Sequence, residues 1–144
     1  MAIKGMAQLR RNVRKQLTFA IPSHAERAMH IATSIIGGYA TLMTPVDTSN
    51  LINSQYRIVK NEGRRVVAAI GYTAKYAAAV HEMSGKLMGQ PRANFGVTRA
   101  GVAFGGGTGR GNYWDPDAEP KFLSKAGDEN LNEIDAAITK AMTI

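Results

Sequence analysis

The stretch that decides the fold, residues 55–71, reads QYRIVKNEGRRVVAAIG. Its two halves, 55–59 and 64–71, are rich in β-branched and aromatic residues, and the Asn61-Glu62-Gly63 segment between them is typical of a tight turn. Adjacent strands joined in this way pair as an antiparallel hairpin. Because an isolated hairpin is only marginally stable in water, we expect it to pack on helices or to join further strands. Residues 94–104 or a neighbouring subunit are the two sources from which such strands would come.

Upstream of the hairpin, residues 2–20 are expected to form a first helix. Apolar residues recur there at helical spacing and, at about 100° per residue, lie on one side of the helix. They are Met6, Leu9, Val13, Leu17 and Ala20. The opposite side is basic and comprises Lys4, Arg10, Arg11, Arg14 and Lys15. Such a face suits nucleic-acid phosphates, an acidic protein or, least favoured because the segment has a single aromatic residue, a membrane surface; a solvated face is the other interpretation.

A second, longer helix is expected over residues 24–43, separated from the first by a break at Ile21-Pro22. Ser23 and Glu26 have the spacing of a capping box, in which the serine hydroxyl and the glutamate carboxylate satisfy backbone N–H groups at the helix start. Each glycine of Gly37-Gly38 costs the helix about 1 kcal/mol relative to alanine. We interpret these two glycines as permitting close packing.

Downstream of the hairpin, a glycine-rich segment interrupts the helical pattern. Residues 73–83 are expected to form a short alanine-rich helix or turn, whereas residues 84–113 contain nine glycines, four bases and no acid. A loop of this length inside a compact domain is uncommon and is usually functional or disordered until bound. We therefore expect residues 84–113 to be mobile in the free subunit and ordered against neighbours, so that limited proteolysis cuts there only before assembly. A C-terminal helix is expected over residues 121–142.

The 144 residues are predicted to form one α+β domain, residues 1–144, large enough to bury about two-thirds of its surface. The hairpin sheet is expected to pack on the helix at 24–43 and on the C-terminal helix at 121–142. The residues expected to be mostly buried are Ile35, Tyr39, Ile58, Val67, Phe122, Leu131 and Ile134. No apolar run approaches the ~20 residues of a membrane span, and the first 16 residues lack the apolar core of a signal peptide.

Charge is distributed unevenly along the chain. Lysine and arginine number 18 against 11 acidic residues, which gives a net charge of +7. Residues 1–46 carry +5, residues 47–82 carry +2, residues 83–113 carry +4 and residues 114–144 carry −4. A basic protein can simply be soluble, but this asymmetry favours contact with a polyanion or head-to-tail association of copies.

Residue types that carry catalysis or bind metals do not form a recognisable site. The chain has no cysteine, which excludes disulfides, thiolate zinc sites and a cysteine nucleophile. His81-Glu82 begins like a zinc-protease motif, but Gly85 stands where the second histidine is needed. The glycine run at 105–111 lacks the lysine and serine or threonine of a phosphate-binding loop, and the acids at 115–119 lack the glycine and terminal glutamate of a calcium loop. We expect no enzyme activity, no cofactor and no metal.

Three short segments stand in order along the chain. They are Thr44-Pro45-Val46-Asp47-Thr48-Ser49-Asn50-Leu51 with Ser54, Tyr76-Ala77-Ala78-Ala79-Val80-His81-Glu82, and Glu119-Pro120-Lys121-Phe122-Leu123-Ser124-Lys125-Ala126. In content and order they resemble a family of small structural proteins of tailed bacteriophages, the tail-completion or head–tail joining proteins, also described as minor tail components. The order of long helix, motif, hairpin, motif, variable loop and final helix is similar too, and the resemblance covers roughly residues 23–142.

The resemblance implies a virion structural protein that forms an oligomeric ring, six-fold like the tail tubes of such phages, at the head–tail junction (neck) or the top of the tail. Its partners would be copies of itself, other neck, tail-terminator or tail-tube proteins, and genomic DNA in the channel, with assembly in the host cytoplasm and no membrane. Ser49 stands where the family prefers glycine, and it would cost about 1 kcal/mol if that position needs a positive φ angle.

Candidate subunit-interface or assembly residues come from the basic helix, the three segments and the glycine-rich loop. They are Arg10, Arg11, Arg14, Lys15, Asp47, Thr48, Tyr76, His81, Glu82, Arg92, Arg99, Arg110, Trp114 and Phe122. The alternative function is a stand-alone nucleic-acid-binding module carried by the basic helix and the basic loop, although its sequence has no interleaved aromatics and no recognised DNA-binding motif. Size-exclusion mass and salt-dependent DNA binding would separate the two.

Overall fold

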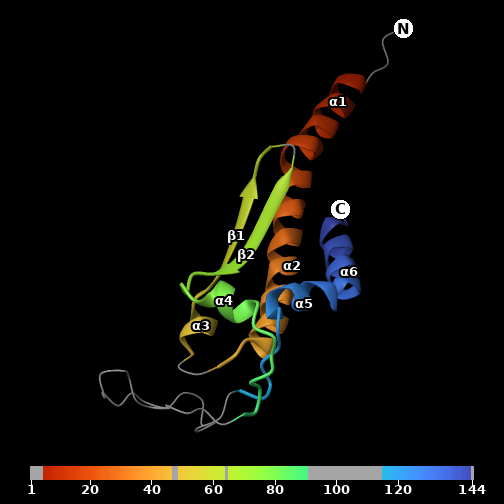
Figure 1. Cartoon of the computed structure of the whole chain (residues 1–144). Helices are drawn as coiled ribbons and strands as arrows, with labels where there is room; N and C mark the ends of the chain where they lie inside the picture. Colours follow the sequence, from red (N-terminus) through yellow and green to blue (C-terminus); the bar gives the residue numbers. More distant parts are fainter. Residues whose placement is uncertain (1–4, 47–48, 64, 91–114, 144) are drawn as a thin grey trace.

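The computed structural model describes residues 5–46, 49–63, 65–90 and 115–143 of the chain. Its elements are α1 (Met6–Lys15), η1 (Gln16–Ala20), α2 (Ile21–Met43), α3 (Asn50–Asn53), β1 (Gln55–Asn61), β2 (Val66–Tyr72), α4 (Ala77–His81), α5 (Phe122–Asp128) and α6 (Leu131–Met142) (Figure 1). The fold is therefore α+β, as the sequence predicts. The further strands considered for residues 94–104 lie outside the described residues.

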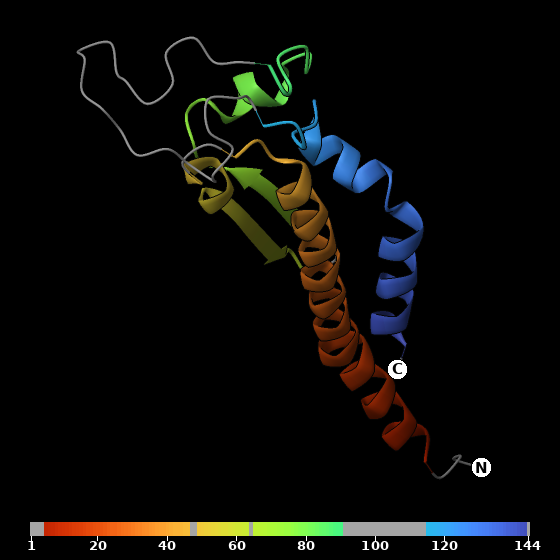
Figure 2. The ribbon, with the colours of Figure 1, turned by 90° about the horizontal axis from the view of Figure 1, so that it is seen from below.

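The long helix α2 lies at the centre of the molecule. Figures 1 and 2 show the hairpin on one side of it and α5 and α6 on the other. On the hairpin side, Gln55 Nε2 donates to the Gly37 carbonyl oxygen at 3.2 Å. On the other side, the Tyr39 hydroxyl donates to Glu133 Oε2 at 2.8 Å, and this hydrogen bond, together with the carboxylate charge, raises the pKa of Tyr39. The two layers are thus attached to neighbouring turns of the same helix.

The prediction of a break at Ile21-Pro22 is wrong, because α1, η1 and α2 follow one another with helical backbone at each junction. Proline lacks an N–H, and its ring presses on the carbonyl four residues earlier, which normally kinks or ends a helix. Here the preceding turn widens into a π-helix, in which the Ile21 N–H donates to the Gln16 carbonyl oxygen five residues back. We attribute the continuity to this wider turn.

The capping box predicted for Ser23 and Glu26 is also wrong, because a capping residue needs a non-helical backbone and Ser23 lies inside α2. The Ser23 hydroxyl donates instead to the Ala20 carbonyl oxygen at 2.9 Å. Glu26 Oε1 accepts from Asn61 Nδ2 at 2.7 Å. Glu26 therefore ties the end of β1 to α2 rather than closing a helix start.

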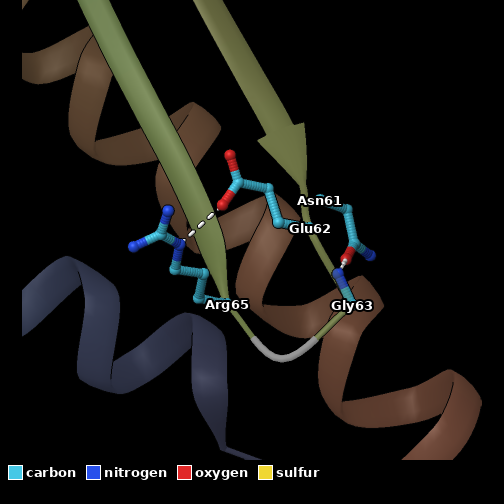
Figure 3. A network of polar contacts seen from close by, with 4 residues as sticks. All are labelled: Asn61, Glu62, Gly63 and Arg65. Carbon is cyan, nitrogen blue, oxygen red and sulfur yellow. Dashed lines mark hydrogen bonds and ion pairs between the residues drawn. The ribbon is translucent and has the colours of Figure 1, made fainter.

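β1 and β2 pair along their full lengths, from Gln55 opposite Tyr72 to Asn61 opposite Val66. Polar contacts hold the turn between them (Figure 3): Asn61 Oδ1 accepts from the Gly63 N–H at 2.8 Å, and Arg65 Nε lies 2.5 Å from Glu62 Oε2. Gly63 has a φ of 79°, which glycine adopts without a side-chain clash. The predicted hairpin and its glycine turn are confirmed.

The core is centred on Phe122, whose side chain is 1% exposed. Leu51 and Ala77 pack with it, and the rings of Tyr72 and His81 meet it edge-on with centroids 5.3 and 5.0 Å away. Further buried residues are Ala28, Ala32 and Ala40 of α2 and Ala126 and Ile134 of the C-terminal helices. The burial predicted for Phe122 and Ile134 is confirmed, whereas Ile35 and Tyr39 are half-buried.

Three other residues predicted to be buried are exposed. Ile58 and Val67 are 42% and 40% exposed, and Leu131 is 55% exposed. Ile58 and Val67 lie on the side of the hairpin that points away from α2, and Leu131 is the first residue of α6. These predictions are wrong because an apolar pattern identifies residues that favour burial but not the layer that covers them.

The C-terminal helix predicted over residues 121–142 is divided in two, α5 and α6. Between them Asn130 has a φ of −114° and a ψ of 20°. Its Nδ2 donates to the Ala126 carbonyl oxygen at 2.9 Å and so occupies an acceptor that a continuing helix would use for a backbone N–H. The division lets α6 lie along α2, where His24 Nδ1 is 2.9 Å from the Ala141 carbonyl oxygen.

Candidate functional site

The three segments that resemble the phage family lie together in the fold. The Val46 N–H of the first segment donates to Asp115 Oδ2 at 3.0 Å, across 69 residues of sequence. The Lys121 N–H of the third segment donates to the His81 carbonyl oxygen of the second at 2.8 Å. Leu51, Ala77 and Phe122, one from each segment, also pack together in the core, so the tertiary structure joins segments that the sequence shows only as separate motifs.

A cavity of about 400 Å³ opens between these segments. Its lining is mainly apolar and includes Val46, Leu51, Val80, Met83, Leu87 and Met88. The candidate residue Tyr76 forms part of the wall, and its hydroxyl oxygen accepts from Asn50 Nδ2 at 3.0 Å. Flexible methionine and leucine side chains around a pocket of this kind suit an apolar group of a partner molecule.

Ser49, at the edge of this cavity, has a φ of 61° and a ψ of 2°. This is the left-handed region, which costs a residue with a side chain roughly 1–2 kcal/mol. Ser49, which stands where the resembled family prefers glycine, therefore does adopt the positive φ angle for which an energetic cost is expected from the sequence.

His81 and Glu82 form a local pair rather than the beginning of a metal site. His81 Nδ1 lies 2.8 Å from Glu82 Oε1, and the imidazole ring packs edge-on against Phe122. The His81 ring therefore packs on the buried Phe122, whereas its partner Glu82 is exposed to solvent. Within residues 5–46, 49–63, 65–90 and 115–143, no three histidine, aspartate or glutamate side chains are placed to share a metal ion.

The basic candidates Arg10, Arg11, Arg14 and Lys15 lie on α1 and are all exposed. The opposite side of the same helical segment is apolar and equally uncovered: Met6, Leu9, Val13 and Leu17, hereafter the α1 stripe, are 43–61% exposed. Neither α1 nor η1 contains a buried residue. In both overall views α1 extends past the tip of the hairpin and past the end of α6 (Figures 1 and 2).

The side of the hairpin turned away from α2 is a second uncovered surface, and sequence reasoning missed it. Tyr56, Ile58 and Val67 lie there and are 40–42% exposed. The signal was present in the alternation of β1, whose residues point in turn to opposite sides. The alternation alone did not identify this surface, because it does not specify which side of the hairpin faces α2.

Six sequence candidates lie outside the described residues, namely Asp47, Thr48, Arg92, Arg99, Arg110 and Trp114. The expectation of mobility for residues 84–113 falls largely outside them as well. The described part of that segment, residues 84–90, contains turns with Gly85 and Gly89 at φ angles of 74° and 68°.

A scan against protein-family models found no family that matches this chain, and searches of curated proteins and of solved structures found no significant match. In the described part of the chain, the helices lack the combination of length and apolar character that crossing a membrane requires.

Proposed function

We propose that this protein is a virion structural protein of a tailed bacteriophage, which forms an oligomeric ring at the head–tail junction or the top of the tail and is needed for tail completion and head–tail joining. The observation that supports this best is α1, whose apolar and basic sides both face solvent. An amphipathic helix is normally stabilised by packing of its apolar side. In a subunit that binds its partners only during assembly, the apolar side of such a helix stays exposed until the partner covers it.

The order of the elements adds support. The long helix α2, the segment at 44–51, the hairpin, the segment at 76–82 and the final helices follow one another as in the phage family that the sequence resembles. That resemblance is the source of the six-fold ring, of neck, tail-terminator or tail-tube proteins as neighbours, and of assembly in the host cytoplasm. The ring performs no catalysis in this proposal.

The charge distribution favours association of unlike surfaces. Residues 5–20 hold four bases and no acid, whereas residues 115–143 hold seven acids and three bases. Identical subunits close into a ring when two different surfaces of each subunit meet, and opposite charges steer such encounters. In the assembled ring, the basic side of α1 would face an acidic neighbour or the DNA in the channel.

Reversal of the basic side tests the proposal. In the variant R10E/R11E/R14E/K15E the four changed side chains are exposed, so each should alter the free energy of unfolding by no more than about 0.5 kcal/mol. The variant should therefore stay folded by circular dichroism. Supplied to a phage that lacks its own copy, it should leave heads and tails unjoined in electron micrographs and greatly reduce the yield of infectious particles.

A matched control reverses four exposed bases elsewhere, Arg27, Arg65, Lys75 and Lys140, and changes the net charge by the same amount. This control should support a normal yield of particles. A normal yield from the α1 variant would instead show that its basic side is only a solvated surface.

A stand-alone nucleic-acid-binding module is the second candidate. It is favoured by the four exposed bases of α1 and by Phe19 on the adjoining turn, which is also exposed. Binding through phosphate contacts weakens steeply between about 50 and 200 mM salt. A monomer in size-exclusion chromatography that binds DNA with this salt dependence would favour the module over the ring.

A further inference from the structure

The side of the hairpin that faces α2 is mixed: β2 contributes half-buried apolar residues, whereas β1 contributes mainly polar ones. Gln55, Arg57 and Asn61 of β1 point toward α2, where Arg57 Nη1 donates to Ser34 Oγ at 2.9 Å and Asn61 Nδ2 to Glu26 Oε1 at 2.7 Å. A sheet that packs on one side usually keeps its polar residues on the solvent side. In β1, Gln55, Arg57 and Asn61 contact the helix beside the half-buried Val59, whereas Tyr56 and Ile58 lie on the outer side.

The outer side of the hairpin, hereafter the outer sheet face, consists of three cross-strand pairs: Tyr56 with Gly71, Ile58 with Ala69, and Lys60 with Val67. Lys60 is the one charged residue among these six. The Tyr56 ring lies over Gly71, where an added Cβ would come within 2.8 Å of the tyrosine hydroxyl oxygen. With Tyr56, Ile58 and Val67 each 40–42% exposed, the outer sheet face is mainly apolar, and exposed apolar surfaces mark interaction sites.

The α1 stripe is the matching uncovered surface, and it cannot reach the outer sheet face of its own chain. Glu26 of α2 already contacts the hairpin end at Asn61. At 1.5 Å per residue, Leu17 and Met6 lie roughly 14 and 30 Å further along the helical rod. Figures 1 and 2 show that α1 extends past the tip of the hairpin. Helical backbone continues from α1 to α2, and no element within residues 5–46, 49–63, 65–90 and 115–143 covers the stripe.

We infer that the α1 stripe of one copy packs along the outer sheet face of the next copy. This deepens the proposed function, on which it rests for the ring, by naming the two surfaces that meet. The dimensions agree: Met6 to Leu17 span roughly 16 Å of helix, and strands of seven residues span roughly 20 Å. A helix about 10 Å wide covers two strands about 4.8 Å apart.

Charge and symmetry select this partner over the other pairings. Two α1 helices packed stripe to stripe would bring together two sets of four bases with no acid in either segment, whereas the outer sheet face adds only Lys60. Sheet-to-sheet pairing would leave every α1 stripe uncovered. Helix-on-sheet pairing covers both surfaces with a single kind of contact, and a contact between unlike surfaces is the type that closes into rings.

Disulfide trapping tests the contact directly, because the chain has no cysteine of its own. Purified V13C and I58C proteins of different tagged mass are mixed and oxidised, and the mixed V13C–I58C disulfide is the expected main product. The control replaces V13C by R11C, which carries its thiol on the basic side of the same helix, and should lose that product. V13C homodimers alone, I58C homodimers alone or no trapped product would each overturn the inference.

A second measurement uses two charge insertions at exposed positions, V13D and I58D. Each protein alone should show loss of the oligomer and the mass of a monomer, with an unchanged circular dichroism spectrum. When the two are mixed, the intact outer sheet face of V13D can still accept the intact α1 of I58D. A heterodimer is therefore expected in native mass spectrometry, and failure to form it would overturn the inference.

These measurements use purified protein, so they separate the contact from the phage role. Trapping as expected, combined with a normal particle yield from V13D, would keep the contact and remove the proposed function. Sedimentation with vesicles that contain phosphatidylserine tests a lipid surface as the alternative cover for α1; vesicle binding without the mixed disulfide would overturn the inference.

Discussion

At the scale of single residues, Ser49 adopts a backbone conformation that is unfavourable for a residue with a side chain. Its φ of 61° places it in the left-handed region immediately before α3, next to the cavity that joins the three segments. Glycine adopts this conformation without steric cost, whereas serine does not. The neighbouring fold keeps Ser49 there because Leu51, two residues later, is part of the core.

Replacement of Ser49 by glycine should therefore stabilise the protein. The expected gain in the free energy of unfolding is about 1 kcal/mol, measured by urea denaturation monitored by circular dichroism. Ser54→Gly is the matched control, because Ser54 has a φ of −85° and its hydroxyl donates to the Leu51 carbonyl oxygen at 2.7 Å. The control should lose stability; a gain from both variants would contradict the explanation.

Phe122 and Leu131 test whether burial was assigned correctly, since the sequence predicts the same role for both. Phe122→Ala removes a ring that is 1% exposed and contacts Tyr72 and His81, and it should lower the free energy of unfolding by about 3–5 kcal/mol. Leu131→Ala, at a position 55% exposed, should change it by no more than about 0.5 kcal/mol in the monomer. Equal losses from the two in thermal unfolding would contradict the exposure described here.

At the scale of elements, the hairpin packs most closely on α2 in a small area around Gly37. A Cβ at Gly37 would lie 2.7 Å from Gln55 Oε1 and 3.1 Å from Ile70 Cδ1, so the hairpin approaches α2 closely there. Gln55 cannot yield freely, because its Nε2 donates to the Gly37 carbonyl oxygen and to the Tyr72 hydroxyl oxygen. At Gly38 an added Cβ meets nothing within 4 Å. The close-packing interpretation of the two glycines therefore applies to Gly37 and is wrong for Gly38.

Alanine at these two neighbouring positions should have opposite effects. Gly38→Ala should raise the free energy of unfolding by up to about 1 kcal/mol, because alanine favours a helix interior without meeting a neighbour. Gly37→Ala should lower it, because the clash with Gln55 outweighs the same gain. The comparison needs only urea denaturation of the two variants beside the wild type, and stabilisation by Gly37→Ala would show that the hairpin can shift away.

At the scale of the whole molecule, α1 and η1 belong to the chain without belonging to its core. Neither contains a buried residue, whereas the C-terminal helices contribute Phe122, Ala126 and Ile134 to the interior. The body of the protein is thus formed by α2, the hairpin and the C-terminal elements. The projecting helix is available for contacts between molecules.

Deletion of residues 1–20 should consequently leave a folded body. The free energy of unfolding should change by less than about 1 kcal/mol, and the denaturant slope should fall only slightly, because little buried surface is removed. Deletion of residues 131–144, which removes the buried Ile134, should abolish cooperative unfolding. If the first deletion unfolded the body, α1 would be part of the fold rather than an assembly element.

The elements set by local physics were determined by the sequence alone. Strand-forming residues and the glycine turn specify the hairpin at 55–71, and helical spacing specifies most of α2. These features depend on interactions between residues close in sequence, so a pattern suffices to find them.

Only the tertiary structure decided what covers each apolar surface. In the structure, the helix continues past Pro22, and the C-terminal helix is divided at Asn130. Polar residues of β1 contact α2. Ile58 and Val67 were therefore left outside, although their residue types favour burial. The physical reason is that the hydrophobic effect rewards removal of apolar area from water without specifying a partner. That partner depends on which elements meet in space, within one chain or between copies.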